Sequence, residues 1–129
     1  MSINNVEELP KDFNLKIKTL RTCIPSNSID LSSPLSNSFE RCSYFIIMDF
    51  NSQKTTAFLN DFQTAPRGVD IQTAQMMTDQ QVEAVIVPEN NSNALNMLQK
   101  AGIKTYLGID GTIQENISLF RQNRLVEIK

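Results

Sequence analysis

The chain has 129 residues, of which 40% are hydrophobic and 20% charged, and its formal net charge is −2. This length predicts one domain whose core needs no metal or disulfide staples. The basic residues form no block, which argues against a nucleic-acid binder and against a polybasic membrane patch. The chain contains no histidine, so its chemistry lacks the commonest general base and metal ligand.

Targeting signals are missing from the sequence. No stretch approaches the roughly 18 apolar residues of a membrane-spanning helix. The first residues, MSINNVEELPKDF, lack the basic-then-apolar pattern of a signal peptide. We therefore expect a cytoplasmic protein, in which Cys23 and Cys42 are reduced thiols rather than a disulfide.

The N-terminal half predicts an extension, a strand, a long loop and a hairpin. Residues 1–14 are polar and predict a flexible extension before a domain at 15–129. Residues 15–24 alternate apolar and polar side chains, as a strand does, and residues 25–41 are rich in the turn-forming Ser, Asn, Asp and Pro. Two apolar or β-branched runs, at 42–50 and 54–62, flank a short turn at 51–53. They predict two antiparallel strands.

The C-terminal half predicts helices that alternate with strands. Apolar residues on helical spacing follow Gly68: Val69 or Ile71, Ala74, Met77 and Val82. A buried strand is expected at 83–88, a helix at 94–101 that ends at Gly102, and a strand at 103–107. Asn91, Ser92 and Asn93 offer an N-cap for the helix at 94–101.

The last helix has the clearest boundaries. Thr112 and Glu115 form a capping box at its start, and Asn123 can close it before a short strand at 124–128. The whole order predicts an α/β fold: a three-layer α/β/α mixed sheet of about five strands. In it an N-terminal antiparallel hairpin is followed by βαβα units, with helices on both faces.

Three segments carry a resemblance to a known family. They are SPLSNSFERCSYFIIMDF, GVDIQTAQMM and NALNMLQKAGIKTYLGIDGTIQENI. In this order and spacing they resemble the dinitrogenase iron–molybdenum cofactor biosynthesis family, over about residues 17–128. The resemblance implies a small α/β domain with a ribonuclease H-like topology.

What the resemblance implies about function is binding rather than catalysis. Family members are similar to carriers and scaffolds that hold an iron–molybdenum cofactor or its iron–sulfur precursor. This implies a non-enzymatic carrier domain, an anionic metal cluster as its ligand, and nitrogenase or cluster-assembly proteins as partners. Whether the chain is a monomer or a homodimer stays open.

The chain departs from the family pattern at several positions. A front loop of Ser-Pro-His-Phe-Gly-Arg is matched here by residues 36–41, with Ser38 at the histidine position and Glu40 at the glycine position. Asp70 stands at a usual glycine, and Asn91-Ser92 replaces a Gly-Pro. The lost glycines would have let backbone amides approach an anionic cluster, and the added carboxylates repel it. The alternative is therefore an interaction or regulatory domain that kept the fold and lost cluster binding.

Candidate ligand contacts lie in the loop 33–41 and at helix starts, because amides, hydroxyls and guanidinium groups bind anions. The expected contacts are Ser36, Ser38, Arg41, Cys42, Gly68 and Asn91. The competing interpretation is a solvated connector with plain helix capping. For Thr112 and Glu115 we favour capping.

Cys42 and Cys23 are candidate metal ligands, because iron–sulfur species prefer thiolates. Two thiolates are too few for a closed four-thiolate site in one chain, although a dimer has four. The other interpretation is that both cysteines are small buried hydrophobes.

A metal-dependent hydrolase of ribonuclease H-like fold is a third hypothesis, since two-metal nucleases cluster carboxylates on adjacent strands. The first predicted strand has no carboxylate, and Asp49 has no obvious partner. Met76, Met77 and Met97 fit a core better than a metal site. We therefore expect no enzymatic activity.

Overall fold

The computed structural model describes residues 21–90 and 93–129. The extension predicted at 1–14 and the first part of the strand predicted at 15–24 lie outside these residues. The described elements, in chain order, are β1 (Arg21–Ser26), β2 (Tyr44–Asp49), β3 (Lys54–Leu59), α3 (Val69–Asp79), β4 (Ala84–Val87), α4 (Ala94–Lys100), β5 (Lys104–Leu107), α5 (Ile113–Arg121) and β6 (Val126–Ile128). No helix among them is long and apolar enough to cross a membrane.

The strands form one mixed sheet in the order β3-β2-β1-β4-β5-β6. The hairpin side is antiparallel, whereas β1 pairs with β4, and β4 with β5, in parallel. The prediction of about five strands was wrong by one. The short strand β6 does join the sheet, because it pairs antiparallel with β5 over Val126–Ile128.

The predicted hairpin is confirmed, with a turn one residue longer than expected. Asp49 pairs with Lys54, so residues 50–53 make the turn. The Gln53 amide donates to the Asp49 carbonyl at 2.6 Å, and Gln53 has a φ of 63°. This left-handed residue lets the chain reverse within four residues.

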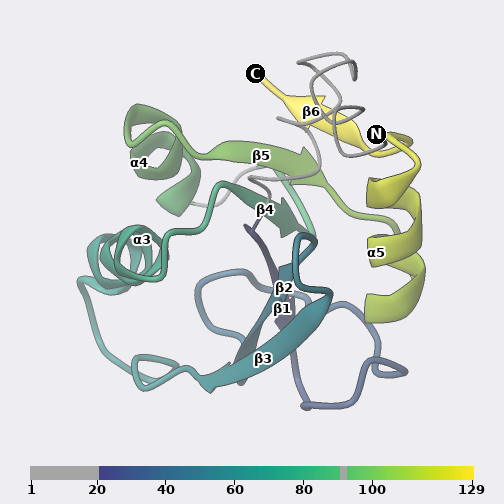
Figure 1. Ribbon diagram of the computed structural model, residues 1–129. Helices are drawn as coiled ribbons and strands as arrows, with labels where there is room; N and C mark the ends of the chain where they lie inside the picture. Colours follow the sequence, from purple (N-terminus) through teal and green to yellow (C-terminus); the bar gives the residue numbers. More distant parts are fainter. Residues whose placement is uncertain (1–20, 91–92) are drawn as a thin grey trace.

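Helices cover both faces of the sheet, as the βα alternation predicts. Successive strand side chains point to opposite faces. In β2, Phe45 and Ile47 belong to the core cluster beside α3 and α4, whereas Ile46 and Met48 belong to the cluster beside α5. Figure 1 shows α3 and α4 on one side of the sheet and α5 on the other.

The helix ends follow their sequence signals. The Thr112 hydroxyl accepts from the Glu115 amide at 3.0 Å and the Glu115 carboxylate accepts from the Thr112 amide at 2.8 Å, which confirms the capping box. A left-handed residue follows each of the three described helices: Gln81, with φ 59°, after α3, Gly102, with φ 83°, after α4, and Asn123, with φ 60°, after α5.

The buried face of α3 agrees with the prediction at Val69 and Met77 and differs from it at two other positions. It consists of Val69, Thr73 and Met77, spaced four residues apart, whereas Ile71 is 57% exposed. A four-residue spacing keeps side chains on one side of a helix, and Ile71 falls on the other side. The helix also ends at Asp79, so Val82 contributes to the core from the following segment.

Candidate functional site

The long loop predicted between β1 and β2 lies across the carboxyl end of β1. It runs from residue 27 to residue 43. The Ser36 amide donates to the Pro25 carbonyl at 3.1 Å, and the Leu35 amide donates to the Gly111 carbonyl at 2.9 Å. The middle of the loop is therefore attached both to β1 and to the segment before α5.

Two serines of this loop, Ser36 and Ser38, form hydrogen bonds with nearby backbone groups of the loop. The Ser36 hydroxyl is buried, donates to the Ser38 carbonyl at 3.1 Å and accepts from the Ser38 amide at 3.3 Å. The Ser38 hydroxyl accepts from the Arg41 amide at 3.1 Å. Local turns of this kind are a common use of serine, so Ser36 shapes the loop rather than facing solvent.

Arg41 and Asn60 connect the loop to the segment that follows β3. The Arg41 guanidinium donates to the carbonyls of Gln63 and Ala65, at 3.1 and 2.9 Å. The buried Asn60 amide donates to the carbonyls of Glu40 and Cys42, at 2.8 Å each. Asn60 carries no distinct signal in the sequence, because an asparagine after a strand is also a common turn residue.

A hollow of about 320 Å³ lies between this loop and the first turn of α3. Its lining residues are Ser38, Glu40, Arg41, Pro66, Arg67, Gly68, Val69, Asp70 and Asn93. The structure thus brings together three of the predicted contacts, Ser38, Arg41 and Gly68. It leaves out Ser36 and Cys42, and Asn91 lies outside the described residues.

The start of α3 presents backbone amides at this hollow. Its N-cap is Gly68, with φ 78°, and no side chain caps the helix there. The N–H groups of a helix's first turn have no partner within the helix, and they attract anions. Nothing would lie within 4 Å of a β-carbon at Gly68, so the glycine serves the backbone conformation rather than close packing.

Charges of both signs line the hollow. Arg41 and Arg67 are basic, whereas Glu40 and Asp70 are acidic. Asp70 lies in the first turn of α3, where the helix dipole favours its negative charge. The carboxylates of Glu40 and Asp70 offset the attraction that the arginines and helix amides offer to an anion.

The two cysteines lie in the core, away from this hollow. Cys23 is fully buried, and Cys42 is 1% exposed with its thiol 3.2 Å from the Tyr44 carbonyl, to which it donates. Burial raises the pKa of Cys42 to about 12, and burial with the nearby Cys42 raises the pKa of Cys23 well above its usual value. Thiolates are the form that binds metal. The structure therefore gives no support to thiolate ligation while the core is closed.

The other helix starts serve local structure. The segment from Gly108 to Thr112 contacts the buried Asn116. The Asn116 side chain accepts from the Ile109 amide at 2.8 Å and donates to the Thr112 carbonyl at 2.9 Å. Asn93 precedes α4 but makes no side-chain capping bond. The N-cap expected among residues 91–93 thus lies at Asn93, without a side-chain bond, and the other two residues are outside the described part of the chain.

The carboxylate that raised the hydrolase hypothesis has structural partners. The Asp49 carboxylate accepts from the amides of Asn51 and Ser52, at 2.9 and 3.2 Å, and contacts the Arg21 guanidinium at 3.4 Å. These bonds lower the pKa of Asp49, and the hydrogen bond from the Ser52 amide has the largest effect. Within residues 21–90 and 93–129, no group of three or more Cys, Asp or Glu is placed to hold a metal ion.

A second hollow, of about 410 Å³, lies where α4, β5 and β6 meet. It contains none of the predicted site residues. Its polar groups bind one another: the Gln99 amide donates to the Thr105 hydroxyl at 3.1 Å and to the Ile128 carbonyl at 3.0 Å. We therefore regard the hollow at α3 as the candidate site.

Comparison with known proteins places this geometry in a family context. The family model described as dinitrogenase iron–molybdenum cofactor matches residues 20–123. An NMR structure of a Thermotoga protein provisionally called NifB is 37% identical, with a TM-score of 0.74, and the match covers 84% of this chain and 92% of that one. A Methanocaldococcus jannaschii protein provisionally called a dinitrogenase is 27% identical, with a TM-score of 0.63, over 86% and 96% of the two chains.

A third solved structure shares the fold at lower sequence identity. The apo form of the orange protein from Desulfovibrio gigas superposes with a TM-score of 0.79 over 85% of this chain and 93% of that one. Its sequence is 20% identical, so this likeness concerns the fold alone.

Proposed function

The chain belongs to the dinitrogenase iron–molybdenum cofactor family, and from this premise we propose that it is a non-enzymatic binding or carrier domain for an anionic metal cluster. The proposed ligand is an iron–molybdenum cofactor or an iron–sulfur precursor, carried as cargo. Its proposed partners are the nitrogenase or cluster-assembly proteins that supply or receive such a cluster.

The observation that carries this proposal is the hollow at the start of α3. It combines uncapped helix amides behind Gly68 with two guanidinium groups, Arg41 and Arg67, and the Ser38 hydroxyl. Each of these groups stabilises negative charge at close range. The family match runs through both of the segments that form the hollow.

These residues would hold a cluster by hydrogen bonds and charge. The hollow's lining contains no cysteine, so the chain offers there no soft ligand for iron. An anion that keeps its own sulfur ligands needs only hydrogen-bond donors and positive charge. The hydrogen-bond donors and guanidinium groups of the hollow fit such a cargo. The carboxylates of Glu40 and Asp70 repel it and weaken its binding.

The second candidate function is an interaction or regulatory domain that has lost cluster binding. The observation that favours it is the pair of carboxylates, Glu40 and Asp70, on the hollow's lining. A hydrolase of ribonuclease H-like fold stays a third hypothesis, and we do not pursue it because the Asp49 carboxylate is taken up by the β2–β3 turn and Arg21.

Anaerobic titration with an iron–sulfur cluster source tests the first candidate against the second. Visible absorbance and iron content would be read for the unchanged chain and for Arg67→Glu, which reverses an exposed charge on the hollow. Arg124→Glu is the matched control, because Arg124 is exposed and lies outside the hollow's lining.

We expect stoichiometric absorbance for the unchanged chain and for Arg124→Glu, and about tenfold weaker binding for Arg67→Glu, which corresponds to about 1.4 kcal/mol. Cys42→Ala should bind as the unchanged chain does. Loss of the cluster in Cys42→Ala would move the site to the core thiol. Failure of the unchanged chain to retain iron would favour the interaction domain.

A further inference from the structure

The segment between β5 and α5 contains the dipeptide Asp110–Gly111. Of all the aspartates in the chain, Asp110 is the one that a glycine follows. Asp110 is exposed, so its carboxyl group meets solvent rather than packed neighbours. Glycine has no side chain, and nothing on Gly111 therefore shields its backbone nitrogen from the carboxyl group of the preceding residue.

The peptide unit that joins these two residues is free of hydrogen bonds. Within the residues that the structure describes, the Asp110 carboxylate, the Asp110 backbone and the Gly111 amide form no hydrogen bond with the protein. Both flanks are held. The Asn116 side chain binds the Ile109 amide at 2.8 Å and the Ile109 carbonyl at 3.2 Å, and the Gly111 carbonyl accepts from the Leu35 amide at 2.9 Å. The Asp110 carboxyl group can thus approach the Gly111 nitrogen without breaking a hydrogen bond of the fold.

We propose that Asp110 is a site of spontaneous isomerisation to isoaspartate in the folded protein. The Gly111 nitrogen bonds to the carboxyl carbon of Asp110, and the carboxyl hydroxyl leaves as water with the amide proton. A water molecule then opens the resulting succinimide ring. Cleavage of the new carbon–nitrogen bond restores aspartate, whereas cleavage of the original peptide bond leaves isoaspartate. Water is lost and regained, so the reaction needs no enzyme, oxidant or cofactor.

Other aspartates of the described chain have neighbours that oppose this reaction. Asp61 is also exposed, but the bulky Phe62 follows it, and the Phe62 amide donates to the Asn60 side chain at 3.0 Å. The Asp49 carboxylate accepts two backbone amides of its own turn. Asp110 therefore combines a free carboxyl group with a free and unshielded nitrogen, and Asp61 serves as an internal comparison.

Isomerisation at this position would change how the long loop is attached. Isoaspartate routes the backbone through the side-chain carbon and lengthens it by one carbon just before Gly111. Three hydrogen bonds of 2.9 Å attach the loop here: the Leu35 amide to the Gly111 carbonyl, the Ile113 amide to the Ser33 carbonyl, and the Gln114 amide to the Leu31 carbonyl. The extra carbon displaces the first of these acceptors relative to α5, so the three bonds no longer match. The loop that lines the candidate site is thereby loosened, whether or not that site binds a cluster.

Ageing of the full, folded chain in neutral buffer tests the proposal. Digestion with an endoproteinase that cleaves before aspartate, but not before isoaspartate, is followed by mass spectrometry. We expect a progressive loss of cleavage at residue 110 without a change in peptide mass, and a minor form, the succinimide, that is lighter by one water. Cleavage at Asp61 should stay complete. Equal loss of cleavage at both positions would assign the reaction to general ageing and overturn the proposal.

Asp110→Glu is the matched control variant, because it keeps the charge and the exposed position but closes a cyclic imide far more slowly, through a larger ring. Its fold should be unchanged, since the Asp110 carboxylate makes no hydrogen bond within the described residues. The unchanged chain aged in urea gives the rate for the unfolded sequence. Isoaspartate at residue 110 in the unfolded sample but not in the folded one would overturn the proposal, because the fold would then protect the site.

Hydrogen exchange measures the consequence for the loop. The amides of Leu35, Ile113 and Gln114 should exchange faster in the aged chain than in aged Asp110→Glu, in proportion to the isoaspartate content. Equal exchange in the two proteins would show that the attachment tolerates the extra carbon, and would overturn the link between the modification and the loop.

Discussion

The thiol of Cys42 shows how burial limits the chemistry of a single residue. It lies in the core cluster beside α3 and α4, and burial raises its pKa to about 12 from an ordinary value of 9.0. A thiol in this state is neither a nucleophile nor a metal ligand at neutral pH. What the residue contributes is packing, together with a dependence of stability on alkaline pH.

We predict that the chain loses stability above pH 9 partly because of Cys42. The folded pKa lies above the unfolded value, so the contribution is complete below pH 9 and is lost as the pH rises towards 12. At pH 10 the unfolded thiol ionises while the folded one does not, which costs about 1.4 kcal/mol relative to pH 8. Urea unfolding at both pH values measures this loss.

Cys42→Ala is the control for this prediction. Its free energy of unfolding should fall between pH 8 and pH 10 by about 1.4 kcal/mol less than that of the unchanged chain. Lysine and tyrosine ionisation are common to both proteins and cancel in the comparison. Equal losses in the two proteins would show that Cys42 ionises as readily in the folded chain as in the unfolded one.

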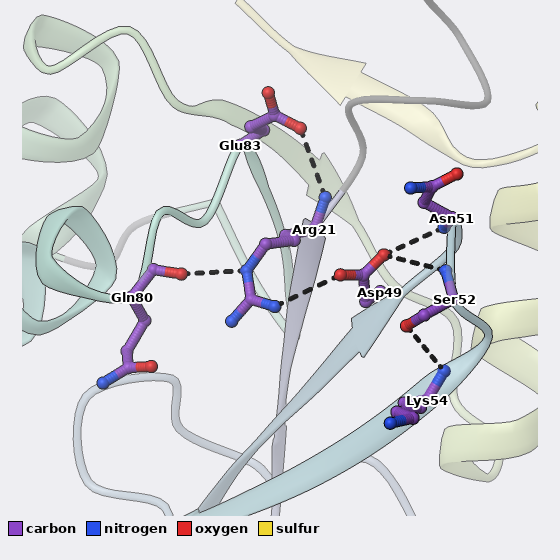
Figure 2. A network of polar contacts seen from close by, with 7 residues as sticks. All are labelled: Arg21, Asp49, Asn51, Ser52, Lys54, Gln80 and Glu83. Atoms are coloured by element: carbon purple, nitrogen blue, oxygen red, sulfur yellow. Dashed lines mark hydrogen bonds and ion pairs between the residues drawn. The ribbon is translucent and has the colours of Figure 1, made fainter.

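At the scale of elements, Arg21 joins the amino end of β1 to its neighbours. Figure 2 shows its guanidinium between the Gln80 carbonyl, at 2.9 Å, and the Asp49 carboxylate, at 3.4 Å, with its backbone amide 3.3 Å from Glu83. Gln80 is the C-cap residue of α3, and Asp49 is the last residue of β2. One side chain thus connects the hairpin to the α3 layer.

We predict that Arg21→Ala lowers the free energy of unfolding by about 1 kcal/mol, with little dependence on salt. The shorter bond, to the Gln80 carbonyl, has an uncharged acceptor, whereas the ion pair with Asp49 is partly exposed and worth little. Urea unfolding in low and high salt measures both effects, with Arg124→Ala as an exposed control. A loss that disappears in high salt would assign the stabilisation to the ion pair.

The elements themselves were largely predictable, because their signals are local. The continuous burial of β2, the capping box of α5 and the left-handed Gly102 each follow from a few adjacent residues. The buried face of α3 was less so. Thr73 is buried on this face although no apolar pattern marks it, since the position of a helix on a sheet depends on packing by residues distant in sequence.

The candidate site could be predicted only in part, for the same reason. Ser38, Arg41 and Gly68 meet at the hollow, but whether a serine faces a ligand or its own backbone depends on local turns. The sequence therefore did not show that the Ser36 side chain is buried against its own loop. Arg67 and Asp70 reach the hollow through the fold, and no spacing in the sequence relates them to Ser38.

At the scale of the whole molecule, three separate parts of the chain meet at Gly108. A β-carbon there would lie 2.7 Å from a Leu35 side-chain atom, 2.8 Å from the Asn116 side-chain oxygen and 2.9 Å from an Ile86 methyl. These residues belong to the long loop, α5 and β4. Close packing at this point holds the loop, and with it the candidate site, against the carboxyl end of the sheet.

We predict that Gly108→Ala lowers the free energy of unfolding by about 2 kcal/mol, because the methyl group forces three packed neighbours apart. Gly102→Ala should cost about 1 kcal/mol for a different reason, since Gly102 has open space but a φ of 83°. Asparagine tolerates a left-handed backbone but is larger than alanine. Gly102→Asn should therefore recover stability relative to Gly102→Ala, and Gly108→Asn should lose more than Gly108→Ala. Urea unfolding of the four variants measures this contrast. If asparagine has the same effect at both positions, Gly108 is not the tight junction that joins the loop, the helix and the sheet.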